Sequence, residues 1–203
     1  MHSFIKKIKS LIMKDGISVV MQKIYWKLTS RIFHAEAVFL WDSKNFNANR
    51  VAPEVSNRMG GIADCQPFAS IFPSYIDQCH KRLNEGDRMY VALVDNKVAY
   101  IMWVASVNKL KLSYVDQHNI ALASESLYIY NCFTLPEYRG MGIYPYMLSY
   151  VASLNPEMQC YVACRYYEKV SIKGVKRAGF RLRWKFFLLK VGAIKIKWRR
   201  QYL

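Results

Sequence analysis

The stretch that decides the fold is Leu127–Gly142, LYIYNCFTLPEYRGMG. Its first half is rich in aromatic and β-branched residues, which predicts a strand over 126–134 that Pro136 closes. Its second half ends in the turn 139–142, RGMG, and the apolar residues that follow, from 143 to 154, recur at helical spacing. The stretch therefore predicts a strand that passes through a glycine-rich turn into a helix.

A turn of this kind favours the binding of a pyrophosphate. The first amides of a helix have no partner within the helix, and the helix dipole adds positive charge at the same point. Gly140 and Gly142 allow the backbone to approach a phosphate closely, and Arg139 can donate charge-assisted hydrogen bonds. The alternative is an ordinary strand-to-helix turn, because Arg-Gly-x-Gly alone is a short motif.

The segments on either side predict alternating strands and helices. We expect strands over 37–41, 89–94, 97–105 and 159–164, and helices over 74–84 and 168–178, the latter ended by Gly179. Residues 182–188 and 194–198 alternate between apolar and basic side chains and predict a terminal hairpin with one basic face. The segment 43–66 contains Asn, Pro and a Gly-Gly pair, which indicates a mostly irregular, loop-like region.

The whole chain has the size and composition of one folded domain. It contains 203 residues, of which 53% are hydrophobic and 22% charged, so disorder and low complexity are excluded. No apolar run approaches the roughly 18 residues that a membrane span needs. Lys14 and Asp15 interrupt any signal-like core near the start, and we therefore expect a cytoplasmic protein.

Neither the cysteines nor the histidines form a ligand pattern. The five cysteines include no CxxC pair, and their odd number argues against a disulfide framework. The four histidines are scattered and have no Glu at helical spacing. We predict no metal, and we interpret Cys132, Cys160 and Cys164 as small strand residues rather than nucleophiles.

The net charge of +16 is concentrated at the two ends of the chain. Residues 1–33 carry seven Lys or Arg against Asp15 alone, and residues 165–203 carry thirteen against Glu168 alone. Such ends favour an anionic partner, which can be nucleic acid, anionic lipid, a phosphorylated substrate or an acidic carrier protein. Composition does not choose among these partners.

We predict two parts, a basic amphipathic helical extension over 1–34 and the main domain over 35–203. Apolar residues recur every three to five positions from Ile5 to Ile32, and a basic stripe accompanies them at Lys23, Lys27 and Arg31. The extension either docks on the domain or lies on the inner face of the membrane as a peripheral helix. Both interpretations need an apolar stripe, so both stay open.

The order of strand, RGMG turn, helix, strand, helix ending in AGF and hairpin resembles the GNAT superfamily of acyl-CoA-dependent N-acyltransferases. The resemblance covers about 73–198, and its specific parts are the decisive stretch and VSIKGVKRAGF at 170–180. It implies an α/β (α+β) fold, in which helices flank a central mixed, mostly antiparallel sheet. It also implies acetyl-CoA as the co-substrate and an N-acetyltransferase activity.

The resemblance assigns residues to the co-substrate. The pantetheine arm would pair with the backbone of Phe133 and Thr134. Tyr144 stands where the family usually has Gly or Ala, which is a departure from the pattern. The pyrophosphate would be held by the turn and the start of the helix, at Arg139, Gly140, Met141, Gly142, Ile143 and Tyr144.

The expected reaction is direct attack of an amine on the thioester, with a base that takes the amine proton and an acid that protonates the thiolate. Relatives often have the acid tyrosine where this chain has Val175, and a common Asn falls on Glu168. The candidate acids are therefore Tyr166 and Tyr167, just past the predicted strand 159–164. The candidate bases are Glu125 and Glu137. For all four, the alternative is an ordinary packing, turn or surface residue.

The acceptor is indicated only indirectly. A basic helical extension before a GNAT core is similar to bacterial acyltransferases of surface-polysaccharide and lipopolysaccharide assembly, which implies a nucleotide- or lipid-linked amino sugar. One alternative is a protein or peptide amine. Another is a non-catalytic nucleic-acid-binding protein that uses Trp184 and Trp198, but this leaves the glycine-rich turn unexplained. Whether the chain forms a homodimer stays open.

Overall fold

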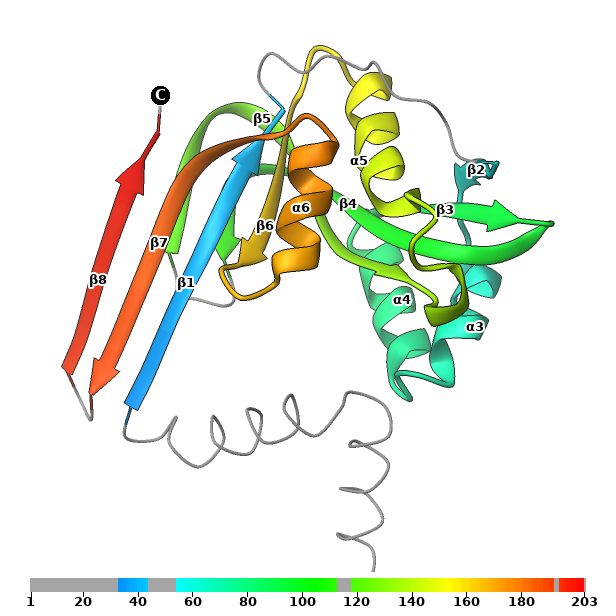
Figure 1. Cartoon of the computed structure of the whole chain (residues 1–203), viewed down its shortest axis with the longest axis horizontal. Coiled ribbons are helices and arrows are strands. Elements are labelled where there is room, and N and C mark those ends of the chain that lie inside the picture. The colour runs from blue at the N-terminus through cyan, green and yellow to red at the C-terminus, as the bar shows by residue number, and fades with distance from the viewer. Residues whose placement is uncertain (1–32, 44–53, 113–117, 192–193, 203) are drawn as a thin grey trace, which may run out of the picture.

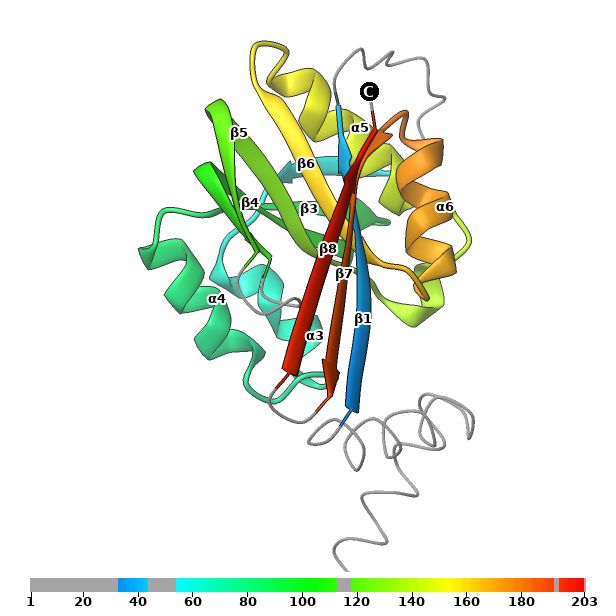
Figure 2. The same cartoon turned by 90° about the vertical axis from the view of Figure 1, so that its left-hand side faces the viewer.

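The computed structural model describes residues 33–43, 54–112, 118–191 and 194–202. Within them, eight strands form one sheet in the order β2-β3-β4-β5-β6-β1-β7-β8. Helices α5 and α6 pack on one face of this sheet and helices α3 and α4 on the other (Figure 1, Figure 2). The strands are β1 (Phe33–Asp42), β2 (Ser56–Met59), β3 (Arg88–Val94), β4 (Lys97–Leu112), β5 (His118–Thr134), β6 (Gln159–Arg165), β7 (Arg181–Val191) and β8 (Ile194–Gln201). The helices are α3 (Gln66–Ala69), α4 (Tyr75–Asn84), α5 (Ile143–Leu154) and α6 (Lys169–Arg177), with short 3-10 turns η1 (Ile62–Cys65) and η2 (Pro136–Tyr138).

The sheet is mixed and mostly antiparallel, as predicted. Among the described strand pairs, β5 and β6 run parallel and the others run antiparallel. The β5–β6 connection is the helix α5, which a parallel crossover requires. The expected fold class is therefore confirmed, and the decisive stretch does run from a strand through a turn into a helix.

Local sequence signals account for the connections that frame the sheet. Asp95 and Asn96 have φ values of 49° and 62°, as the tight turn between β3 and β4 requires. Gly179 has a φ of 89° and follows α6, where the Phe180 N–H donates to the Val175 carbonyl at 3.3 Å. This is the bonding of a glycine-terminated helix, and it confirms the predicted end of α6.

Strand β1 differs from the prediction in length and in position. It covers Phe33–Asp42 rather than 37–41, and it lies inside the sheet between β6 and β7. Ten residues of β1 pair with β7, and this distant pairing extends the strand over 33–36, where the local β signal is weak. The predicted boundary between 34 and 35 falls within this strand. Residues 1–32 of the predicted helical extension lie outside the described residues.

The segment 43–66 is more regular than predicted. The structure describes Ser43 and the part from Glu54 onward, which contains β2, η1 and the first residue of α3. Pairing of β2 with β3 creates the strand, because Ser56–Met59 alone carries little β propensity. Long-range pairing therefore overrides a local loop signal here.

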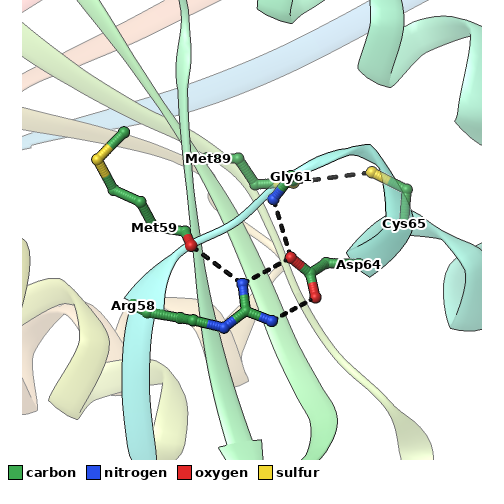
Figure 3. A network of polar contacts seen from close by, with 6 residues as sticks. All are labelled: Arg58, Met59, Gly61, Asp64, Cys65 and Met89. Atoms are coloured by element: carbon green, nitrogen blue, oxygen red, sulfur yellow. Dashed lines mark hydrogen bonds and ion pairs between the residues drawn. The ribbon is translucent and has the colours of Figure 1, made fainter.

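An ion pair fixes the chain where β2 leaves the sheet (Figure 3). The Asp64 carboxylate accepts hydrogen bonds from both terminal nitrogens of Arg58, at 2.7 and 2.8 Å, and from the Gly61 N–H at 2.8 Å. The Asp64 side chain is 11% exposed, whereas that of Arg58 is 49% exposed. The bonds from Arg58 lower the pKa of Asp64 below its ordinary value.

We expect Asp64→Asn to lower the free energy of unfolding at pH 7 by about 1 kcal/mol, because solvent screens the half-exposed Arg58. The folded-state pKa of Asp64 is depressed, so the native pair stabilises the fold at neutral pH and is lost as the pH falls below about 4. Urea unfolding at pH 7 and pH 3 measures the effect. A difference between native and variant proteins that is equally large at pH 3 would contradict it.

The terminal hairpin has apolar residues on both faces, which corrects the prediction of one basic face. Phe187 pairs with Trp198, so these two side chains lie on the same face of the sheet. Phe186 pairs with Arg199 and is buried on the opposite face, against β1 and the β4–β5 hairpin. The faces that meet depend on how β7 pairs with β8, and alternation within each strand does not reveal this register.

Candidate functional site

The sheet opens between β5 and β6, and a cleft forms there. The two strands pair only through Ser126–Ile129 and Gln159–Val162, and beyond this point they separate. A bulge helps to turn β5 away, because Asn131 and Cys132 together oppose a single residue of β4 and Asn131 has a φ of 48°. The end of β5 therefore presents a backbone edge to the cleft.

The cleft has a volume of about 500 Å³. Its walls are the end of β5, the RGMG turn with the first turn of α5, the end of β6, and α6. Helices α5 and α6 stand side by side over the point where the strands diverge (Figure 1). A cavity of this size at the carboxyl ends of parallel strands is a common place for a small-molecule ligand.

The RGMG turn contains two glycines with positive φ values. Gly140 and Gly142 have φ values of 88° and 76°, and a Cβ at either position would meet no atom within 4 Å. Glycine is thus required by backbone conformation and not by neighbouring atoms. Gly142 is the N-cap of α5, and the N–H groups of Ile143 and Tyr144 lie in the first turn, where the helix offers them no acceptor.

Arg139 lies at the edge of this turn. Its Nε donates to the Thr134 carbonyl at 3.3 Å, and its guanidinium lies over the Phe133 ring, 5.5 Å from the centroid. Arg139 is exposed, and the remaining guanidinium N–H groups can reach an anion at the mouth of the cleft. Met141 is 41% exposed and is not among the residues that line the cleft.

Tyr144 projects from the first turn of α5 into the cleft. A Cβ on Gly174 of α6 would lie only 2.5 and 2.7 Å from two carbons of the Tyr144 ring. The tyrosine and the glycine are therefore complementary, although 30 positions separate them. The Tyr144 hydroxyl interacts with the Cys164 thiol, and burial raises the pKa of Tyr144 well above its ordinary value.

We expect Gly174→Ala to destabilise the protein, although alanine favours an interior helix position by about 1 kcal/mol. The added methyl group collides with the Tyr144 ring, and overpacking of this kind costs about 1–3 kcal/mol, so the steric effect dominates. Chemical denaturation measures the change. In a Tyr144→Ala background the same substitution should become neutral or stabilising; an unchanged penalty there would contradict the pairing.

Three further side chains with polar atoms, Tyr100, Cys132 and Cys164, line the inner wall of the cleft. The Tyr100 side chain is fully buried, with its ring centroid 6.3 Å from that of Tyr144 and its hydroxyl next to the Cys132 thiol. Burial raises the pKa of the Cys132 and Cys164 thiols to about 12. Both thiols are therefore protonated at neutral pH, as expected of strand residues that are not nucleophiles.

Glu168 is the carboxylate that lines the cleft. It precedes α6 as its N-cap, and its Oε2 accepts a hydrogen bond from the Arg165 N–H at 3.1 Å. The two carboxylates singled out in the sequence lie elsewhere. Glu125 is exposed near the start of the β5–β6 pairing and accepts a hydrogen bond from Ser106, whereas Glu137 is exposed on η2.

Tyr166 and Tyr167 follow β6 directly, but they are not among the residues that line the cleft. Their side chains are 44% and 46% exposed, and the Tyr167 hydroxyl accepts a hydrogen bond from Arg165 at 2.8 Å. Val175, on the buried face of α6, is fully buried in the core. The acid role of Tyr166 or Tyr167 stays a prediction that this arrangement does not favour.

In the sequence, Tyr144 and Glu168 stand out only as departures from a family pattern. Tyr100 does not stand out, because it reads as one more apolar residue of a strand. The sequence signal for the contact between the first turn of α5 and α6 is a bulky residue at 144 combined with Gly174 in the middle of a helix. Alone, neither residue indicates the other.

The described ranges hold neither a metal cluster nor a membrane span. Within them, no group of three His, Cys, Asp or Glu side chains could hold a metal ion. None of the helices in those ranges is both long and apolar enough to cross a bilayer.

No protein-family profile and no curated protein matches the sequence. Solved structures do resemble it. A GNAT-family acetyltransferase from Colwellia psychrerythraea has a TM-score of 0.56 at 11% identity and covers 81% of this chain. A conserved protein of unknown function from Staphylococcus epidermidis has a TM-score of 0.53 at 17% identity and covers 85%. A GNAT-family protein from Novosphingobium aromaticivorans has a TM-score of 0.51 at 13% identity and covers 85%.

This chain spans 60%, 67% and 68% of the lengths of those three proteins, respectively. At such low identity the likeness concerns the fold. It agrees with the mixed sheet, the flanking helices and the single parallel pair among the described strands. The chain therefore has the α+β fold of the GNAT acetyltransferases.

Proposed function

We propose that the protein is an N-acyltransferase that moves an acetyl or other short acyl group from acyl-CoA to a primary amine. The observation that carries this proposal is the cleft between β5 and β6, with the RGMG turn and the start of α5 at its mouth. A backbone edge, a helix N-terminus and an arginine meet there, and each suits a different part of an elongated, anionic thioester.

The residues of the cleft can divide the binding of acyl-CoA among them. The amides of the turn and of the first turn of α5, with Arg139, would hold the pyrophosphate. The backbone of Phe133 and Thr134, at the edge of β5 that β6 leaves open, would pair with the amides of the pantetheine arm. The buried hydroxyl of Tyr100, next to the Cys132 thiol, would offer a further hydrogen bond to the bound ligand.

The reaction then needs two proton transfers. The amine loses a proton and attacks the thioester carbonyl carbon, which forms a tetrahedral intermediate. The carbon–sulfur bond breaks, the amide forms, and the departing thiolate takes a proton. Positioning of the two substrates in the cleft supplies much of the rate, because the attack becomes effectively unimolecular.

Tyr144 and Glu168 are the groups within the cleft that fit these transfers. Tyr144 lines the cleft with a hydroxyl that is protonated at neutral pH, and it would donate this proton to the departing thiolate. Glu168 can take a proton from the amine directly or through a water molecule. Glu125 and Glu137, the bases suggested by sequence, would have to act from outside the described cleft.

For the acceptor we propose an anionic amino sugar that is linked to a nucleotide or a lipid, as in cell-surface glycan biosynthesis. The cations of the cleft wall and the basic terminal strands support this class, because they attract a phosphorylated acceptor. A lipid-linked acceptor would place the reaction at the membrane surface.

Isothermal titration with acetyl-CoA tests the donor half of the proposal, and thiol release from acetyl-CoA in the presence of nucleotide-linked amino sugars tests the acceptor half. We expect micromolar donor binding and acceptor-dependent release. No binding to any acyl-CoA would overturn the proposed function. Thiol release with peptide amines but not with amino sugars would overturn only the acceptor class.

A further inference from the structure

The outer strands of the sheet expose an apolar surface on the face that α5 and α6 cover elsewhere. Helix α6 lies over β6 and β1, whereas no described element lies over β8 on that side (Figure 1). The strand register places three residues of β7 beside three of β8 on this face. We call this surface the outer apolar face, and it consists of Phe187, Leu189, Val191, Ile194, Ile196 and Trp198.

Several residues of the outer apolar face are more exposed than large hydrophobic side chains usually are. Ile194, Ile196 and Trp198 are 66%, 58% and 53% exposed, and Val191 is 45% exposed. The Trp198 ring lies against the Phe187 ring, with centroids 4.9 Å apart, so the tryptophan is held on the face. A contiguous patch of exposed apolar residues on a folded protein commonly marks a surface that contacts a partner or a membrane.

Cations border the outer apolar face. The register places Lys185 and Arg200 on this side of the hairpin, whereas Lys197 and Arg199 lie on the opposite side. Lys185 pairs with Arg200 at one end of the face, and both cations lie against the Tyr202 ring, at 4.9 and 5.3 Å from its centroid. The surface thus combines exposed aliphatic residues, a tryptophan and a cationic border.

We propose that the outer apolar face is the surface through which the protein lies on an anionic membrane. Aliphatic side chains and a tryptophan enter the interfacial region, and lysine and arginine at the border interact with anionic headgroups. This inference does not depend on the proposed enzymatic activity, because it concerns a surface formed by β7 and β8.

Two other partners fit the surface less well. A second copy of the chain could pair along the edge of β8, but this would place strands with four cations and no carboxylate next to each other. A nucleic acid would use the cations and Trp198, but it gives no reason for exposed Ile194 and Ile196, since bases stack on aromatic rings. A lipid surface uses all three features.

Co-sedimentation of the full-length protein with vesicles tests the proposal. We expect binding to vesicles of 70% phosphatidylcholine and 30% phosphatidylglycerol and at least tenfold weaker binding to phosphatidylcholine alone. Ile196→Ser combined with Trp198→Ser should reduce binding at least tenfold, while circular dichroism and thermal unfolding confirm that the variant folds. Brominated lipid should quench the tryptophan emission, and Trp198→Phe should remove much of that quenching.

Two neighbouring arginines provide a matched control. Arg200 pairs with Lys185 and lies on the same side as the outer apolar face, whereas Arg199 pairs with Phe186 and lies on the opposite side. Arg200→Gln and Arg199→Gln remove the same charge, and only Arg200→Gln should weaken vesicle binding several-fold. The proposal is overturned if the Ile196/Trp198 variant binds vesicles like the native protein. It is also overturned if the native protein binds RNA or dimerises through β8 but ignores anionic vesicles.

Discussion

Replacing Gly142 with valine should weaken acetyl-CoA binding at least about 100-fold. Gly142 caps α5 with a φ of 76°, which valine adopts only with strain, so the first amides of the helix would turn away from the phosphate position. Loss of two charge-assisted hydrogen bonds, at about 1.5–3 kcal/mol each, corresponds to a change of this size. Isothermal titration of the folded variant with acetyl-CoA measures it.

Gly86 offers a matched control for this substitution. It has a φ of 87°, and a Cβ there would also meet no atom within 4 Å. Gly86→Val therefore introduces the same kind of backbone strain at the end of α4, outside the cleft. We expect similar losses of stability in both variants but a loss of donor affinity only at Gly142. If acetyl-CoA binds equally to both, the RGMG turn is not the phosphate site.

The features that the sequence predicts best are those that adjacent residues determine. The end of the strand at Thr134, the glycine-rich turn and the helix that follows depend on residues within one short stretch, although β5 begins at His118 rather than at 126. The same holds for the end of α6, where Gly179 and Phe180 complete the bonding locally. A turn whose dihedral angles require glycine can therefore be recognised from the order of its residues alone.

The features that the sequence does not predict depend on distant residues. Strand β1 takes its length and its interior position from pairing with β7, about 150 residues away in the chain. The side of the sheet on which Trp198 lies depends on register, since a shift by one residue would exchange the faces. For the same reason the outer apolar face could not be separated from the buried face of the same hairpin.

The inner wall of the cleft shows the same limit. If the turn is considered alone, a tyrosine at position 144 is expected to hinder the approach of a phosphate, because the family pattern has a small residue there. The Tyr144 ring fits against α6 because residue 174 is a glycine without a side chain, and the Tyr144 hydroxyl lies next to Cys164. Tyr144, which departs from the family pattern, therefore places a hydroxyl group inside the cleft. This hydroxyl is the group that we propose for the proton transfer.

Replacing Tyr144 with phenylalanine should lower kcat by about 10²–10⁴-fold with little change in acetyl-CoA affinity. The phenyl ring keeps its contact with Gly174, so the variant should fold normally and lose only the hydroxyl. Without the hydroxyl, the thiolate leaves without a positioned proton donor. The measurements are thiol release under saturating substrates and isothermal titration with acetyl-CoA.

Tyr166→Phe and Tyr167→Phe serve as the comparison, because both remove an exposed hydroxyl within two residues of the end of β6. If Tyr144 is the acid, both variants keep turnover close to that of the native protein. If Tyr144→Phe is fully active and one of the other two is not, the acid comes from the end of β6, as the sequence suggested. Equal activity in all three would mean that solvent protonates the thiolate, and the role of Tyr144 would then be limited to packing against α6.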